Sequence, residues 1–262
     1  MIRETPEERA KRRRQRARFD EVAAVYDRTR SGYPTEIVDR LLATAGLARR
    51  SAVLEIGCGT GQLTEELARR DLDVTAIDLA PSMVFAARER LADLQVDLRV
   101  GAFEEFDPGG SRYDAIVSAT AFHWIDPEVA WTKSADLLAP DGWIAILSTA
   151  ERYDEPFAGR FRDQWIRYSD DGGAWASATP PTLPEVIAAS GRFGEAVTVT
   201  HHERREVDVE VVVALEQTRA TFLSYDEETR SRFVEDLRRL LTGAAAVALT
   251  QETTLTMAPR RS

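Results

Sequence analysis

The sequence predicts an α/β fold built on a doubly wound, parallel sheet, and three observations support this prediction. Short apolar runs alternate with helical patterns through residue 148, as in sheets whose strands are buried on both faces. A glycine-rich turn follows the first run, where a helix should begin. The chain has 262 residues, of which 44% are hydrophobic, so it can bury the core of one such domain.

Five apolar runs in the first part of the chain have the length of strands. They cover residues 52–56, 74–77, 95–100, 115–118 and 143–147. The helix after the first run is indicated by Leu63 and Leu67, which lie four residues apart and therefore on one face. The helix after the second run is predicted to begin at Pro81, because proline suits the first turn of a helix. Its apolar face is marked by Met83, Ala87 and Leu91.

The pattern changes beyond residue 148. Aromatic residues at helical spacing predict one helix; they are Phe157, Phe161, Trp165 and Tyr168. Asp, Gly and Pro then predict loops at 170–173 and 178–181, so we interpret residues 151–190 as an insertion. The remaining segments are a strand at 197–201, helices at about 208–223 and 226–241, and a last strand at 250–257.

The turn after the first strand indicates a ligand site. Gly57, Gly59 and Gly61 alternate along it, and bare backbone at the start of a helix lets a ligand approach closely. Dinucleotide sites need the spacing G-x-G-x-x-G, but residue 62 is Gln, and the chain lacks a G-x-x-x-x-G-K-[ST] phosphate loop. A ligand without phosphates is therefore favoured. Asp78, about twenty residues downstream, suits the two hydroxyls of a ribose.

These residues resemble a known family. The pattern E-x-G-x-G-x-G from Glu55 to Gly61, followed by Asp78, is similar to that of class I S-adenosylmethionine (SAM)-dependent methyltransferases. Residues 113–118 and 137–143 match its fourth strand and the turn into its fifth. Further segments resemble the small-molecule branch that includes trans-aconitate methyltransferase; they are 26–34 and 121–124. The resemblance implies a mostly parallel, seven-stranded sheet with an antiparallel last strand, and a helical cap at about 151–190 and 208–241.

The resemblance implies SAM as the cofactor and assigns several residues to it. Gly57 and Gly59 would pass close to its methionine part, Glu55 would order the loop, and Asp78 would bind the ribose. Residues implied beside the adenine or elsewhere in the cofactor site are Leu79, Met83, Ala102, Phe103, Gly61 and Ser118. Leu79 and Met83 could equally be core residues.

An acidic side chain that often binds the adenine amino group in relatives is missing here, because Ala102 stands at its position. The backbone of Ala102 and Phe103, or the side chain of Glu104, could replace it. Glu104 could equally be a solvated residue at the start of a helix.

The resemblance also implies that Tyr26 and Arg30 bind the cofactor, and it places further residues near the acceptor. Tyr26, Arg30 and Tyr33 belong to a segment that folds over the cofactor site in the resembled branch. Arg30 could bind a carboxylate of the cofactor or of the acceptor through two parallel hydrogen bonds, or it could form a surface salt bridge. His123, next to Trp124, follows the fourth strand at the edge where ligands bind. It is a candidate general base, although it could simply pack in its loop.

Other chemistry-bearing residues suggest structural roles. Cys58 is interpreted as a small filler of the turn, and His201 and His202 lie on an expected edge strand without a third ligand, so we expect no metal site. The aromatic residues between Phe157 and Tyr168, with Trp175, are expected both to pack the cap and to line the acceptor pocket.

Charge is unevenly distributed along the chain. The net charge is −10, yet residues 9–18 carry seven basic side chains and no acidic one. We interpret residues 1–18 as a basic N-terminal tail, either solvated or in contact with nucleic acid or an anionic membrane surface, and residues 19–262 as the methyltransferase domain. The acidic remainder would repel a phosphate backbone, which disfavours a nucleic-acid partner.

The sequence lacks an apolar stretch of the roughly 20 residues that a membrane span needs. It also lacks a secretory signal and has one cysteine, so a cytoplasmic location and no membrane partner are expected. The predicted function is in-line transfer of the SAM methyl group to an oxygen, nitrogen or carbon nucleophile, including a carboxylate, of a small molecule. The alternatives are a nucleic-acid methyltransferase that uses the basic tail, and a non-catalytic SAM-binding regulator. The sequence leaves the acceptor and the oligomeric state open.

Overall fold

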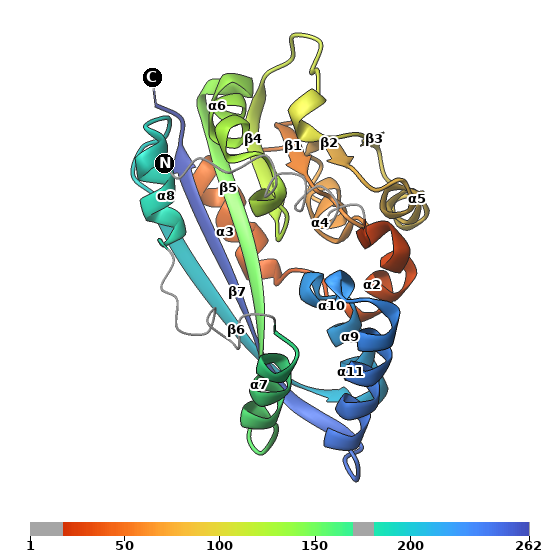
Figure 1. The fold of residues 1–262 in the computed structure, drawn as a ribbon. Helices are drawn as coiled ribbons and strands as arrows, with labels where there is room; N and C mark the ends of the chain where they lie inside the picture. Colours follow the sequence, from red (N-terminus) through yellow and green to blue (C-terminus); the bar gives the residue numbers. More distant parts are fainter. Residues whose placement is uncertain (1–17, 170–180, 262) are drawn as a thin grey trace.

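The protein is described from a computed structural model, which covers residues 18–169 and 181–261. Its centre is one seven-stranded sheet with the strand order β3-β2-β1-β4-β5-β7-β6 (Figure 1). The strands are β1 (Ala52–Ile56), β2 (Asp73–Asp78), β3 (Val96–Val100), β4 (Tyr113–Ala119), β5 (Leu138–Tyr153), β6 (Val197–Asp208) and β7 (Ala246–Pro259). β7 runs antiparallel to β5 and β6, whereas the pairs among β1 to β5 are parallel. The predicted fold class is thereby confirmed.

Helices cover both faces of the sheet because its strands are apolar on both sides. On one face, α3 (Thr35–Ala45) and α4 (Gln62–Ala68) bury Leu41 and Leu67 against β1 and its neighbours. On the other, Phe103, Ile125 and Ile187 share a core with β1, β4 and β5. That layer contains η2 (Phe103–Glu105), η3 (Phe122–Trp124), α6 (Pro127–Leu137) and α8 (Leu183–Ser190). α8 therefore packs beside α6 and β7 on the sheet.

The three long strands carry the cap. β5, β6 and β7 extend well beyond the apolar runs that predicted them, and Figure 1 shows their far ends continuing to the remaining helices. These are α7 (Phe157–Arg167), α9 (Val209–Gln217), α10 (Ala220–Ser224) and α11 (Glu227–Leu240). They enclose a second core, which includes Phe161, Val212, Phe222, Phe233 and Leu237. The helix expected at 208–223 is two helices, α9 and α10, because the backbone of Arg219 is extended between them.

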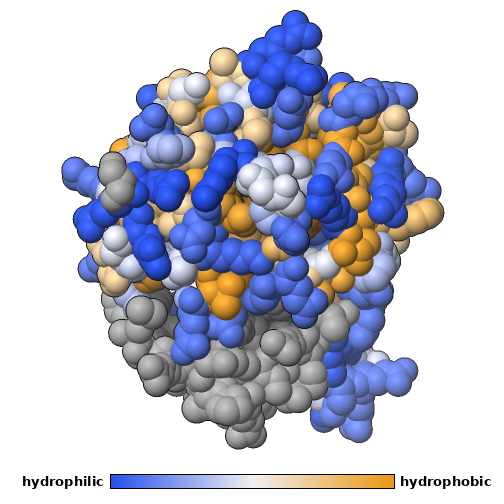
Figure 2. Space-filling view, turned by 90° about the horizontal axis from the view of Figure 1, so that it is seen from above, coloured by the Kyte–Doolittle hydropathy of each residue, from blue (hydrophilic) through white to orange (hydrophobic). Residues whose placement is uncertain are grey.

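The first described segment joins the two parts. η1 (Arg18–Val22) and α2 (Ala23–Thr29) contact α5 (Pro81–Arg90) and the cap helices. The basic tail expected at 1–18 lies outside the described residues except for Arg18. Within the described ranges, no helix is long and apolar enough to cross a membrane. The described part of the face in Figure 2 is mostly hydrophilic, with apolar residues in smaller groups between.

Candidate functional site

The glycine turn between β1 and α4 is fixed by the backbone of β2. The amides of Gly57 and Cys58 donate to the Ile77 carbonyl at 2.8 and 3.1 Å. Gly57 and Gly59 have positive φ angles of 72° and 55°. A Cβ on Gly57 would lie 2.3 Å from the Cβ of Ala121, whereas a Cβ on Gly59 would meet nothing within 4 Å. The turn therefore presents bare backbone to open space at Gly59.

That open space belongs to a cavity, here called the glycine cavity. Its lining includes Gly57, Gly59, Asp78, Leu79, Met83 and Phe103. The carboxylate of Asp78 is held in place because Oδ2 accepts from the Gly59 amide and Oδ1 from the Ala80 amide, each at 2.9 Å. Met83 and Phe103 are buried and supply apolar walls. The cavity thus combines main-chain polar groups, an oriented carboxylate and an apolar slot.

Glu55 supports the turn from behind. Its side chain is buried, and the Thr64 hydroxyl donates to its Oε2 at 2.6 Å, which links β1 to α4. Burial, with a smaller contribution from the nearby Asp78 carboxylate, raises the pKa of the Glu55 carboxyl to about 8, against the lowering effect of the Thr64 hydrogen bond. This arrangement is consistent with the loop-ordering role that the resemblance implies for Glu55.

Some residues expected at the cofactor site lie behind or beside the cavity wall. Gly61 begins α4 against Ala87 and Leu91. Ser118 is buried, and its hydroxyl donates to the Ile56 carbonyl at 2.8 Å, so it joins β4 to β1. Ala102 lines a separate pocket near β3.

The Glu104 carboxylate, a candidate for the adenine contact, binds the main chain and does not line the glycine cavity. Its Oε1 accepts from the Asp126 amide at 3.1 Å, at the start of α6. Of residues 102–104, Phe103 is the one that lines the glycine cavity.

A second cavity, the cap cavity, has a volume of about 350 Å³. Residues from η1, α2, α4, η3, β5 and α10, and from the segments that directly follow α2 and α9, line it, including Arg30, Gln62, His123, Glu151 and Arg219. It shares four lining residues with the glycine cavity; they are Phe19, Tyr26, Thr120 and Trp124. Its volume falls at the lower end of the range of about 300–1,000 Å³ typical of small-molecule sites.

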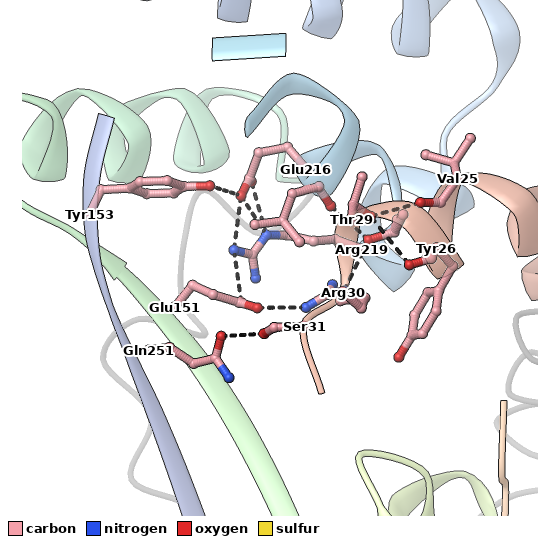
Figure 3. Close-up of polar contacts among 12 residues, drawn as sticks. Val25, Tyr26, Thr29, Arg30, Ser31, Glu151, Tyr153, Glu216, Arg219 and Gln251 are labelled. Atoms are coloured by element: carbon pink, nitrogen blue, oxygen red, sulfur yellow. Dashed lines mark hydrogen bonds and ion pairs between the residues drawn. The ribbon is translucent and has the colours of Figure 1, made fainter. Parts of the chain in front are cut away.

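Paired charges lie along one side of the cap cavity (Figure 3). Arg30 Nη1 donates to Glu151 Oε1 at 2.8 Å, and Arg30 Nε donates to the Thr218 hydroxyl at 3.2 Å. Arg219 Nη2 lies 3.5 Å from Glu151 Oε2 and 2.9 Å from Glu216 Oε1. The side chains of Arg30 and Glu151 are 20% and 3% exposed, so Arg30 is not in a surface salt bridge. Its guanidinium group lines the cap cavity and is paired with Glu151.

His123 also lines the cap cavity, next in sequence to Trp124, which lines both cavities. Its ring centroid lies 4.9 Å from that of Trp124, and the Trp124 ring packs edge-on against Phe19. The side chain reaches the cavity solvent, but partial burial lowers the pKa of the imidazole below its usual 6.5. His123 is therefore neutral at pH 7 and can accept a proton or a hydrogen bond.

Sequence reasoning missed several residues of the cap cavity, above all Gln62, Glu151 and Arg219. Gln62 follows the glycine turn directly; its amide nitrogen is buried and has no hydrogen-bond partner among the described residues. Its position directly after Gly61, at the start of the helix that follows the turn, is the sequence feature that could have identified it. Glu151 and Arg219 carry no such signal, because they belong to no motif and meet only through the fold.

The aromatic residues of α7 pack the cap, as expected, and the two cavities described here do not include them in their lining. Phe161 is buried in the cap core, and Trp165 and Tyr168 pack against Phe233 of α11 with ring centroids 4.6 and 5.1 Å away. α7 packs on α11 and β5, so these rings stabilise the cap, whereas the cap cavity lies on the α9–α10 side. Trp175 lies outside the described residues. Cys58 is buried in the turn, and His201 and His202 lie on the edge strand β6.

Comparison with known proteins identifies the family. Residues 53–142, from β1 into the first part of β5, match a family model described as a methyltransferase domain. A Mycobacterium tuberculosis protein described as an uncharacterized methyltransferase is 30% identical over 238 residues, which cover 88% of each chain. The chain belongs to the methyltransferase family. The trans-aconitate 2-methyltransferase of M. tuberculosis is 37% identical to this methyltransferase over 122 residues, 44% of each chain.

Solved structures agree with the fold of this methyltransferase. A structure described as a type II methyltransferase from Anaeromyxobacter dehalogenans superposes with a TM-score of 0.60 at 20% identity, covering 88% of this chain and 97% of that one. The enzyme is a SAM-dependent methyltransferase, and SAM is its cofactor. The glycine cavity fits an adenosyl group, because an oriented carboxylate stands beside bare backbone and an apolar slot.

Proposed function

We propose that this methyltransferase methylates a small molecule held in the cap cavity. The observation that carries the proposal is the shared wall: the cap cavity meets the glycine cavity at Tyr26, Thr120 and Trp124. SAM, when bound, supplies a methyl group on a cationic sulfur that keeps the bonding electron pair as the methyl group leaves. The contribution of the protein is to hold the acceptor atom in line, and such alignment is worth effective molarities of about 10⁵–10⁸ M.

We propose that Asp78 binds the ribose of the cofactor. The support is its fixed orientation at the wall of the glycine cavity. Asp78→Asn should weaken the binding of S-adenosylhomocysteine at least tenfold, because a hydrogen bond to a charged group contributes about 1.5–3 kcal/mol. Isothermal titration calorimetry measures this. The matched control is Asp114→Asn, since Asp114 also accepts from a main-chain amide, that of Ala52, at the start of β1. Equal affinity of the Asp78 variant and wild type would contradict the assignment.

We propose His123 as the base when the acceptor atom is a hydroxyl oxygen. The oxygen lone pair forms the new C–O bond, and the proton of the hydroxyl passes to the His123 imidazole. Because the pKa of His123 is lowered from 6.5, wild-type kcat should fall on the acid side with a midpoint below pH 6.5. His123→Asn should lower kcat about 10²–10⁴-fold and remove that acid limb. A variant that keeps both the rate and the acid limb would assign His123 to packing alone.

The cavity assignment is tested by blocking it. Thr221 is an exposed residue of the cap cavity, and Thr221→Trp should abolish turnover of every small acceptor while leaving S-adenosylhomocysteine binding intact. Ser231→Trp, an exposed position on α11, is the control. The assay is release of S-adenosylhomocysteine with a metabolite panel, with DNA and with RNA. Turnover of nucleic acid, or unchanged turnover by Thr221→Trp, would contradict the proposal; cofactor binding without any turnover would favour a regulatory role.

A further inference from the structure

The charges around the cap cavity cancel. Arg30 and Arg219 are the cations on its wall, and Glu151 lies between them (Figure 3). Glu216, behind Arg219, is fully buried and completes the second pair. Two guanidinium groups thus face two carboxylates, and His123 adds no charge at neutral pH. The side chains along this wall are charged, but their charges sum to zero.

Both carboxylates are held in place, so they cannot turn away to make room for an acceptor anion. Glu216 accepts hydrogen bonds from the Tyr153 hydroxyl at 2.6 Å and from Trp165 Nε1 at 2.7 Å, in addition to Arg219. Glu151 bridges the two guanidinium groups, with its side chain 3% exposed. Leaving a buried charge without its partner costs several kcal/mol. The paired arrangement is therefore favoured over one in which Glu151 or Glu216 moves away from its arginine.

The groups that remain for an acceptor are neutral. The buried Gln62 amide nitrogen has no partner among the described residues, although its amide oxygen accepts from the Thr60 hydroxyl at 3.0 Å. A buried donor without a partner costs about 1–3 kcal/mol, so a ligand oxygen that accepts from it is stabilising. The hydroxyls of Thr149 and Thr221 and the ring of Trp124 also line the cavity. These groups suit hydroxyl, carbonyl or amide groups on a molecule with one apolar face.

We propose that the cap cavity selects an acceptor without net charge, and that Glu151 sets this selectivity by occupying the place between two arginines where an acceptor carboxylate would otherwise bind. The inference rests on the proposed function of the cap cavity. An anionic acceptor would bring an unpaired charge into a wall that is already neutral, which discriminates against it. Similarity to the trans-aconitate enzyme covers 44% of the chain, so it does not extend over the whole cap cavity.

The test uses trans-aconitate, a tricarboxylate, as the probe. It is titrated by calorimetry into the full chain saturated with S-adenosylhomocysteine, at constant ionic strength. Wild type should bind it more weakly than about 1 mM, and Glu151→Gln should bind it at least about tenfold more tightly, because both guanidinium groups become available. The control is Glu252→Gln, which removes one carboxylate from the adjacent strand β7. Glu252 lies beside Arg152 and His202 and is not among the residues that line the cap cavity. This variant should behave as wild type does.

Each outcome decides the inference. Sub-millimolar binding or turnover of trans-aconitate by wild type overturns the selectivity, and a Glu151→Gln protein that gains no affinity overturns the role of Glu151. Glu151→Ser is a second variant without the charge, in case the Gln variant does not fold, and S-adenosylhomocysteine binding by each variant reports folding of the site. Calorimetry needs no turnover. Failure of the proposed function would appear instead as unchanged turnover by Thr221→Trp, or as no turnover of any small acceptor.

Discussion

At the scale of single residues, Glu55 supports the glycine turn and has a raised pKa. It is a buried carboxyl directly before the glycine turn, with one hydrogen bond from Thr64 and with Asp78 near enough to raise its pKa. Burial favours the neutral acid. The residue therefore couples the stability of the cofactor turn to pH.

The sign of that coupling is measurable. The folded-state pKa of Glu55, about 8, lies above the ordinary 4.5, so its contribution to stability is fully present below pH 4.5 and is lost as the pH rises toward 8. Relative to Glu55→Gln, wild type should lose up to about 1.4 kcal/mol of unfolding free energy per pH unit in that window. Urea unfolding of both proteins from pH 5 to 8.5 measures the difference. Glu36→Gln, at an exposed site, is the control; a constant difference between wild type and Glu55→Gln would contradict the raised pKa.

Where a local motif exists, the sequence was enough to group residues that the structure brings together. Gly57, Gly59 and Asp78 lie together on one cavity wall, because the turn and the end of β2 are neighbours in any sheet of this type. Sequence-based prediction failed for Glu151 and Arg219, because Glu151 meets Arg30 across 121 residues of sequence and Arg219 across 68. Spacing along the chain carries no information about such a contact.

At the scale of elements, the β1–α4 turn offers a matched pair of substitutions. Gly57→Ala and Gly59→Ala both place a side chain at positive φ, at a cost of about 1–2 kcal/mol, but only the first meets a neighbour, Ala121, at 2.3 Å. We expect Gly57→Ala to lower the unfolding free energy clearly more than Gly59→Ala does. Gly59→Ala should mainly weaken S-adenosylhomocysteine binding, because its methyl group enters the glycine cavity. Thermal unfolding and calorimetry separate the two effects; equal destabilisation would contradict the clash.

Element lengths explain where sequence-based prediction of the fold stopped. The pattern located all seven strands, but β5 continues to Tyr153 and β6 to Asp208. Their outer halves alternate between exposed and covered residues as they pair with β7. A continuous apolar run indicates burial on both faces, so it ends where helices leave one face, although the pairing continues. The same outer halves form the floor of the cap.

At the scale of the whole molecule, Glu216 fastens the cap to the sheet. It lies on α9 and accepts from Tyr153 of β5, Trp165 of α7 and Arg219. Glu216→Gln should lower the unfolding free energy by about 3–5 kcal/mol, because it leaves the Arg219 charge partly uncompensated. Glu210→Gln, on the same helix but in an exposed pair with Arg238, should change it by less than about 1 kcal/mol. Chemical denaturation compares them, and equal losses would show that the buried cluster is not what secures the cap.

The unbroken strands β5 and β7 connect the cap to the rest of the sheet. Their antiparallel register runs without interruption from Trp143, beside the parallel strands, to Tyr153, beneath the cap, so these strands join the cap to the sheet as one continuous element. The segment 18–30 is attached differently, by side-chain bonds from Asp20 to Ser82 and from Asp27 to Arg90. Because Arg30 at its end is held in the buried pair with Glu151, this segment ties the α5 side of the glycine cavity to the cap, while the strands keep the spacing between the two cavities constant.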